Sequence, residues 1–243
     1  MIPLSDNVPS RRRPWITYLI IALNAGIFLH QLSLPGRELA QLLATYAVIP
    51  ARVGGPLMLL FPDRWPALVP LVTAAFLHGS WVHVGGNMLY MWIFGDNVEG
   101  SMGSLRFLLF YLLTGALGNL AHVVANPHSV VPTIGASGAV AGVLGAYLLM
   151  FPHARVLALV PLGLFFTVAE IPAVVFLLIW FLLQLLSGIT AFGAQTVAWW
   201  AHIGGFLAGM ILVLWFRRSS TSRRRRSREI DIFDQDNGRR PWR

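Results

Sequence analysis

The chain has 243 residues, of which 56% are hydrophobic and 12% charged, and its formal net charge of +8 rests on arginine because the sequence contains no lysine. This composition is typical of an integral membrane protein, and the length suits one domain of several spans rather than two soluble domains. The absence of cysteine excludes disulfides, thiolate metal sites and cysteine nucleophiles.

The amino-terminal segment, residues 1–14, carries an arginine run at 11–13 and precedes the first apolar run. A secretory signal peptide can begin in this way. No A-x-A cleavage pattern follows closely, however, and we therefore interpret the apolar run as a retained first span. Because arginine beside a span is typical of the cytoplasmic side of a membrane, residues 1–14 are predicted to form a basic cytoplasmic segment.

Six apolar segments have the length to cross a hydrocarbon core about 30 Å thick, or nearly so where neighbouring helices shield them. We predict an all-α integral membrane protein in which these segments form a bundle of six transmembrane helices over residues 15–216. The predicted spans cover about residues 15–34, 82–94, 105–125, 137–151, 171–189 and 197–216.

Arginine clusters at both ends predict that both termini are cytoplasmic, which requires an even number of spans. The first connection, residues 35–80, lacks a run of spanning length, and we expect short helices that lie in the outer interface of the membrane. The tail, residues 217–243, is expected to be disordered, with its basic half resting on anionic lipid. Its arginine runs lack interleaved aromatic residues, and no nucleic-acid partner is expected.

Four polar side chains lie near the starts of predicted spans that all run from outside to inside. His83 and Asn87 open the second span, Ser137 opens the fourth, and His202 lies near the start of the sixth. Taken singly, each is a common interhelical hydrogen-bonding residue. Four polar groups at matching depth favour a functional site, because polar side chains inside a membrane are costly.

Small residues at helical spacing offer a way to bring two of these side chains together. They lie along the fourth and sixth spans at Gly138, Ala141, Gly142, Gly145, Ala201, Gly205 and Gly209. Such stripes let helix backbones approach closely. If the two stripes face each other, Ser137 and His202 come within hydrogen-bond reach, and the imidazole can take the proton of an attacking hydroxyl.

Attack on a carbonyl creates an oxyanion, which needs preorganised hydrogen-bond donors. The candidates are the Asn87 amide, a ring N–H of His83 and the backbone N–H of Ser137. Because the acidic residues near the spans belong to the cytoplasmic side, no third member is apparent, and we predict a Ser137/His202 dyad. Metal catalysis is disfavoured because the seven histidines include no H-E-x-x-H pattern and no carboxylate lies at matching depth.

Three motifs in this order resemble those of the rhomboid family of intramembrane serine proteases: HVGGN at 83–87, GASG at 135–138 and AHIGG at 201–205. The resemblance covers the six-span core, and further segments resemble bacterial members. It implies that Ser137 is the nucleophile, His202 its base, and His83 and Asn87 the oxyanion-hole side chains.

For function, the resemblance implies an endopeptidase that cleaves transmembrane or membrane-proximal segments of other membrane proteins. The expected partners are those substrates and membrane lipid, and no cofactor or metal is implied. The expected location is the bacterial inner membrane. Many relatives carry an aromatic residue four positions after the serine, where this chain has Ala141. We therefore expect another aromatic residue, such as Trp199 or Trp200, to hold His202.

Two other functions remain open from the residues. A catalytically inactive rhomboid-like protein could bind transmembrane helices without cutting them, but such proteins generally lose the serine, the histidine or both. A small transporter is less favoured, because transporters often place ionisable residues or broken helices near the midplane, and the acidic residues of this chain avoid that depth.

Overall fold

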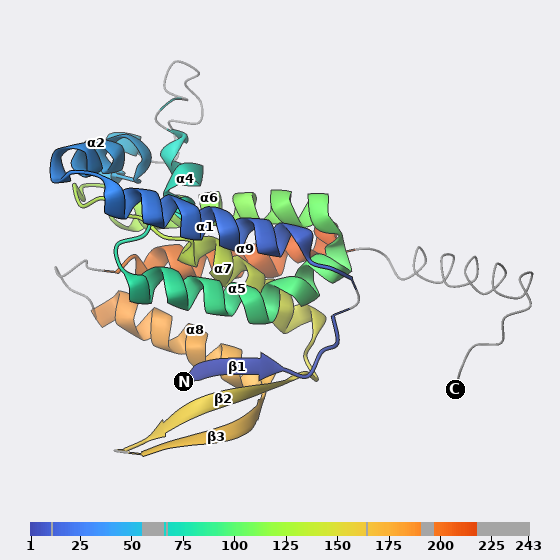
Figure 1. Ribbon diagram of the computed structural model, residues 1–243. Helices are drawn as coiled ribbons and strands as arrows, with labels where there is room; N and C mark the ends of the chain where they lie inside the picture. Colours follow the sequence, from blue (N-terminus) through green and yellow to red (C-terminus); the bar gives the residue numbers. More distant parts are fainter. Residues whose placement is uncertain (11, 55–65, 67, 164, 191–196, 218–243) are drawn as a thin grey trace, which may run out of the picture.

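The computed structural model describes all residues except 11, 55–65, 67, 164, 191–196 and 218–243. Almost all of the tail predicted to be disordered therefore lies outside the described residues. In the described part, most residues are helical, and the long helices run side by side in one bundle (Figure 1). The long helices are α1 Trp15–Ser33, α5 Trp81–Met102, α6 Ser104–Ala125, α7 Ser137–Met150, α8 Ala173–Thr190 and α9 Trp199–Phe216.

Each of the six predicted spans corresponds to one of these helices. By length and composition, four of them, α1, α6, α8 and α9, are long and apolar enough to cross a membrane. The chain is thus an integral membrane protein. Helix α7 is apolar but has only 14 residues, and α5 is not among the four although it has 22. The bundle of six helices is present, whereas six complete crossings stay a prediction.

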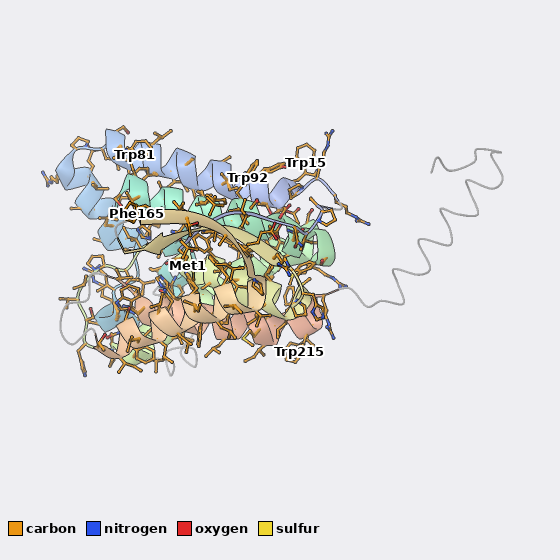
Figure 2. The ribbon with its side chains drawn as sticks, turned by 90° about the horizontal axis from the view of Figure 1, so that it is seen from below. Met1, Trp15, Trp81, Trp92, Phe165 and Trp215 are labelled. Carbon is orange, nitrogen blue, oxygen red and sulfur yellow. The ribbon has the colours of Figure 1, made fainter. Side chains whose placement is uncertain are left out.

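Exposed apolar and aromatic side chains cover the outside of the bundle. The tryptophans Trp15 and Trp215 lie toward one end of the bundle and Trp81 toward the other (Figure 2), and all three are at least 62% exposed. Tryptophan is enriched at both membrane–water interfaces, where its ring reaches apolar and polar surroundings at once. The positions of these three side chains agree with helices that run across the bilayer.

In its described residues the first connection forms short helices, as predicted, whereas their place in the outer interface stays a prediction. They are α2 Gly36–Tyr46, α3 Pro50–Val53, α4 Pro70–Thr73 and the 3₁₀ turn η3 Ala74–Phe76. They gather at the end of the bundle where α1 finishes (Figure 1). Proline at the start of α3 and α4 fits a first helical position, which needs no hydrogen-bonded N–H.

A three-stranded antiparallel sheet, in the order β1-β2-β3, corrects the expectation of an all-α protein. Strand β1 Ile2–Asp6 pairs with β2 Arg155–Leu162, which forms a hairpin with β3 Phe165–Pro172. Alternate β2 side chains, Val156 and Ala158, are fully buried in the core of the bundle. The pairing brings the amino-terminal segment beside the fourth connection, which agrees with the prediction that both lie on one side of the membrane.

Glu99 joins three helices at the end of the bundle near the sheet. Its carboxylate accepts hydrogen bonds from the backbone N–H of Ile16 at 3.1 Å, from the N–H and hydroxyl of Thr17 at 2.8 and 2.9 Å, and from the Ser104 hydroxyl at 2.6 Å. The first N–H groups of a helix have no partner within the helix. Glu99, only 2% exposed, therefore caps α1 from α5 and contacts the start of α6.

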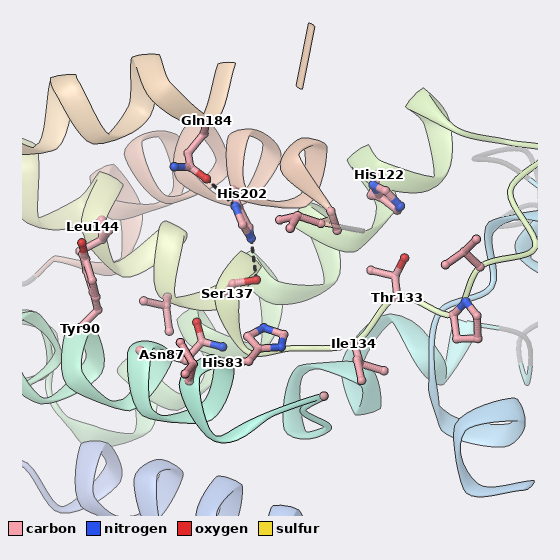
Figure 3. A pocket seen from close by; sticks show the side chains of 18 of the residues that line it. His83, Asn87, Tyr90, His122, Thr133, Ile134, Ser137, Leu144, Gln184 and His202 are labelled. Carbon is pink, nitrogen blue, oxygen red and sulfur yellow. Dashed lines mark hydrogen bonds between the residues drawn. The ribbon is translucent and has the colours of Figure 1, made fainter. Parts of the chain in front are cut away.

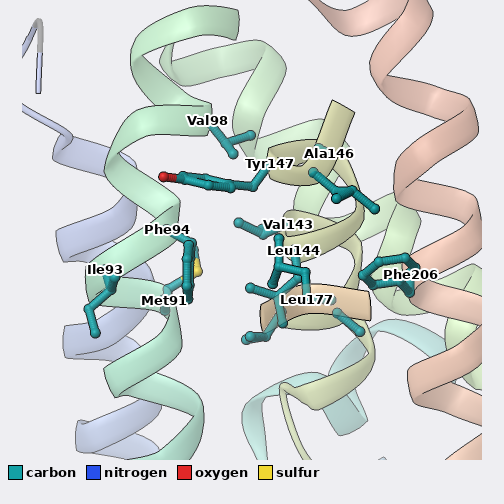
Figure 4. Packing of buried hydrophobic residues seen from close by; sticks show 14 of the residues in the cluster. Met91, Ile93, Phe94, Val98, Val143, Leu144, Ala146, Tyr147, Leu177 and Phe206 are labelled. Atoms are coloured by element: carbon teal, nitrogen blue, oxygen red, sulfur yellow. The ribbon is translucent and has the colours of Figure 1, made fainter. Parts of the chain in front are cut away.

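Helix α7 occupies the centre of the bundle, and every residue from Gly138 to Leu148 is buried. Its side chains Val143, Leu144 and Tyr147 pack among residues of the neighbouring helices (Figure 4). On one side, the rings of Phe94 and Tyr147 meet edge to face with centroids 4.9 Å apart. Because the neighbouring helices enclose α7, its packing fixes the position of Ser137, the first residue of the helix.

Helices α7 and α9 touch along the two predicted stripes of small residues. A Cβ atom at Gly205 would collide with the carbonyl oxygen of Gly138, and one at Gly209 would collide with that of Gly142. The expectation that the stripes face each other is confirmed. Backbone contact at this distance is possible only with glycine, because any side chain would force the helices apart.

Candidate active site

The α7–α9 contact brings Ser137 and His202 together. Ser137 is the first residue of α7, and His202 is in the first turn of α9. The Nε2 atom of His202 lies 2.7 Å from the Ser137 hydroxyl oxygen (Figure 3). A hydroxyl and an imidazole at this distance form the hydrogen bond along which a general base can remove a proton.

The first glycine of the GASG motif, Gly135, makes room for His83. A Cβ atom at Gly135 would lie 2.6 Å from His83 Nε2 and 3.6 Å from the Ser137 hydroxyl oxygen, and the φ of Gly135 is +128°. Both the positive φ and the close contact require glycine. Helix α5 starts beside this point, because the Ser80 side chain accepts a hydrogen bond from the His83 backbone N–H and caps the helix.

Asn87 lies one turn after His83 and is held by His78. The Asn87 side-chain nitrogen is 3.0 Å from His78 Nε2, and the Ala136 backbone N–H donates to the same nitrogen at 3.4 Å. Because both partners are donors, His78 Nε2 acts as the acceptor. An amide nitrogen carries two hydrogens, and the contact with His78 therefore uses only one hydrogen of Asn87. Gln31 in turn fixes the backbone of His78 by two hydrogen bonds.

Two residues of α8, which sequence reasoning missed, complete the surroundings of His202. The Gln184 Oε1 atom is 2.7 Å from His202 Nδ1. The ring centroids of Trp180 and His202 are 6.2 Å apart, and the two ring planes make an angle of 33°. The Trp199 ring meets the imidazole edge to face at 5.9 Å. The expectation that another aromatic residue packs on His202 in place of residue 141 is thus confirmed for Trp199.

These side chains open into a cavity of about 910 Å³ between α5, α7, α8 and α9, which is also lined by His122 of α6 and by the segment 129–134 before α7. Ser137, His202, His83 and Asn87 all line the cavity, together with apolar side chains such as Leu144 and further polar ones such as His122 and Gln184. Among the described lining residues there is no carboxylate, and no group of three or more His, Asp or Glu side chains is placed to hold a metal in the described part of the chain. The four residues predicted from the sequence are thus neighbours in one site.

The fold and site define a class: helical membrane proteins with a hydrogen-bonded serine and histidine on two helices of the bundle. The family comparison agrees with this class. The sequence model of the family described as "Rhomboid domain" matches residues 66–219, well over half of the chain. The chain belongs to the rhomboid family.

Relatives in several organisms carry rhomboid names. "Rhomboid-like protein 11, chloroplastic" of Arabidopsis thaliana is 28% identical over 86% of this chain and 68% of its own length. "Rhomboid protein 1, mitochondrial" of Saccharomyces cerevisiae is 36% identical over 42% of this chain, and "Rhomboid protease GluP" of Bacillus subtilis is 43% identical over 35%. The matched regions cover only 31% and 16% of the yeast and Bacillus proteins.

Proposed function

We propose that the protein is an intramembrane serine endopeptidase that cleaves transmembrane or membrane-proximal segments of other membrane proteins. The observation that carries the proposal is the 2.7 Å contact between His202 Nε2 and the Ser137 hydroxyl oxygen inside the bundle. Two Bacillus subtilis relatives, matched over part of their length, have "rhomboid protease" in their names, which supports peptide hydrolysis as the reaction.

In the proposed reaction, the Ser137 oxygen attacks the carbonyl carbon of the scissile peptide bond while His202 Nε2 takes the hydroxyl proton. When the C–N bond breaks, His202 returns that proton to the leaving amine. A water molecule then attacks the acyl-enzyme, with the same nitrogen as base. The products are a carboxylic acid and free Ser137.

The negative charge that develops on the carbonyl oxygen needs donors that are already in place. The second amide hydrogen of Asn87, a ring N–H of His83 and the backbone N–H of Ser137 are proposed for this role. The first N–H groups of a helix have no intrahelical partner and lie at the positive end of the helix dipole, and both features suit Ser137 as a donor. Removing one such donor typically lowers the rate by about 10²- to 10³-fold.

The proposed substrate is an unwound segment of a membrane protein. In a continuous helix the peptide groups are shielded by their own turns, and an attacking oxygen reaches a carbonyl carbon only where the helix has opened. A cavity of about 910 Å³, lined by apolar as well as polar side chains, has room for a few residues of such a segment. Helix-weakening residues near the cut are expected to favour cleavage.

The proposed topology has six spans over residues 15–216, with the basic segment 1–14 and the tail 217–243 in the cytoplasm. The pairing of β1 with β2 supports it, since the amino terminus and the fourth connection must lie on one side. Ser137 and His202, at the starts of α7 and α9, are then near the outer face. The proposed location is the bacterial inner membrane; the organelle names of two relatives leave that location to be tested by fractionation.

The test uses purified protein in proteoliposomes with a transmembrane substrate that carries a helix-weakening residue. The wild type is expected to cut the substrate, and Ser137→Ala and His202→Ala are expected to leave it intact. The matched controls are Ser33→Ala and His30→Ala, whose side chains are exposed at the end of α1. Cleavage that persists in both dyad variants would refute the proposal, and binding without cleavage by the wild type would support the inactive alternative.

A further inference from the structure

Gln184 lies on α8, on the side of His202 that faces away from Ser137. A mechanism with a serine and a histidine alone does not require Gln184. Its neighbours in the sequence are apolar, in the run LLQLL. An uncharged amide inside a membrane helix is costly unless it makes hydrogen bonds. The Gln184 side chain makes two hydrogen bonds, one at each end of the amide. Together they determine which ring nitrogen of His202 carries the proton.

The first hydrogen bond fixes the orientation of the amide. The Gln184 side-chain nitrogen donates to the Trp180 carbonyl oxygen at 3.3 Å, one turn earlier in α8. A carbonyl oxygen can only accept, and the nitrogen end of the amide must therefore point to Trp180. The oxygen end is left facing His202, 2.7 Å from Nδ1.

The second hydrogen bond fixes the proton on the imidazole. An amide oxygen can only accept, and His202 Nδ1 must therefore carry a hydrogen. In a neutral imidazole the other nitrogen then has a free lone pair. That nitrogen is Nε2, 2.7 Å from Ser137, and the serine hydroxyl must donate to it. The dashed lines from Gln184 through His202 to Ser137 in Figure 3 follow this chain of donors and acceptors.

We propose that Gln184 is a positioning residue that holds His202 in the tautomer and orientation needed to accept the Ser137 proton. The role rests on the proposed function. Gln184 also stabilises the imidazolium that forms during attack, because its amide oxygen accepts the Nδ1 hydrogen in both states. Trp180 lies on the same face of α8, and its ring packs against the imidazole with the two ring centroids 6.2 Å apart. This packing limits rotation of the imidazole.

The test measures the rate at which an active-site fluorophosphonate, which needs no transmembrane substrate, labels Ser137 in proteoliposomes. Three variants are compared with the wild type across pH. Gln184→Met keeps the length of the side chain and removes the acceptor, Gln184→Glu keeps an acceptor oxygen, and Leu183→Met is the control on the exposed side of α8. Thermal unfolding of each variant reports whether the bundle is intact.

Gln184→Met is expected to slow labelling by about 10- to 100-fold. This is less than the roughly 10⁴-fold loss known for removing a charged partner of a catalytic histidine in serine proteases. Gln184→Glu is expected to recover most of the rate and to move the acid limb of the rate–pH profile upward, because a carboxylate beside Nδ1 favours the imidazolium. His83 of α5 and His122 of α6 also line the cavity and are the same in every variant.

The two possible failures can be told apart. If a folded Gln184→Met labels as fast as the wild type, or if Met and Glu slow labelling equally with the same pH profile, the positioning role is overturned while the dyad stands. If the wild type is not labelled, or if Ser137→Ala is labelled as fast, the proposed function fails and the role of Gln184 fails with it.

Discussion

Substitution of Gly205 by alanine tests how strictly the α7–α9 contact controls the site. An added Cβ would collide with the Gly138 carbonyl oxygen, so the helices would have to separate by about 1 Å to restore a normal contact. Overpacking of this kind typically costs about 1–3 kcal/mol. His202 lies three residues before Gly205 and Ser137 directly before Gly138, and their 2.7 Å hydrogen bond must lengthen by a similar amount.

The expected result for Gly205→Ala has two parts. The free energy of unfolding falls by about 1–3 kcal/mol, and fluorophosphonate labelling of Ser137 slows by about 10²-fold, the effect of a 1 Å misplacement of reacting groups. Gly26→Ala is the control, because a Cβ there would meet nothing within 4 Å. Wild-type stability and labelling in Gly205→Ala would refute the argument that this contact sets the distance between serine and histidine.

Asn87→Ala lowers the rate of substrate cleavage by about 10²- to 10³-fold without abolishing it, which a steady-state assay measures. Glu99→Ala lowers the free energy of unfolding by about 2–4 kcal/mol, because its buried donors lose their acceptor, and denaturant titration measures the loss. Burial raises the pKa of Asp6 above its usual value, although hydrogen bonds from Tyr147, Val8 and Asn97 oppose the shift. The folded state therefore binds the Asp6 proton more tightly, and stability falls as the pH rises from about 4 through the raised pKa, a trend that Asp6→Asn should weaken in thermal unfolding.

Unchanged cleavage in Asn87→Ala would remove that amide from the oxyanion site. For Glu99 the control is Glu38→Ala, at an exposed position of α2, and equal losses in both variants would contradict the capping role. For Asp6, the same pH dependence in the wild type and in Asp6→Asn would assign the titration to another group.

The sequence was sufficient to predict the helices and the contact that forms the site. Apolar runs mark the long helices because the membrane requires them. The small residues at helical spacing predicted the α7–α9 contact, since only small residues allow backbones to approach so closely. From that contact, the meeting of Ser137 and His202 followed directly.

The sheet could not be predicted by the same reasoning. Residues 155–172 are apolar on both strand faces, and the alternation that identifies a half-buried strand is weak. Strand β1 is a stretch of five residues whose partner, β2, lies about 150 positions away. Pairing over such a separation depends on the finished bundle.

Gln184 and Trp180 were missed for a related reason. Their contact with His202 depends on how α8 lies against α9, and no stripe of small residues marks that contact in α8. The signal that could have found Gln184 was its chemistry: an uncharged amide in the apolar run LLQLL must have a partner. Ala141 was a second signal, because it led to the prediction that an aromatic side chain from elsewhere in the chain packs on His202.

The central claim is that His202 activates Ser137 as a nucleophile. Its most direct test is to treat the wild type and His202→Ala with a fluorophosphonate and to locate the modified residue by mass spectrometry. We expect modification at Ser137 in the wild type and a loss of nearly all of it in a folded His202→Ala. Modification at another residue, or equal modification of Ser137 without His202, would contradict the claim.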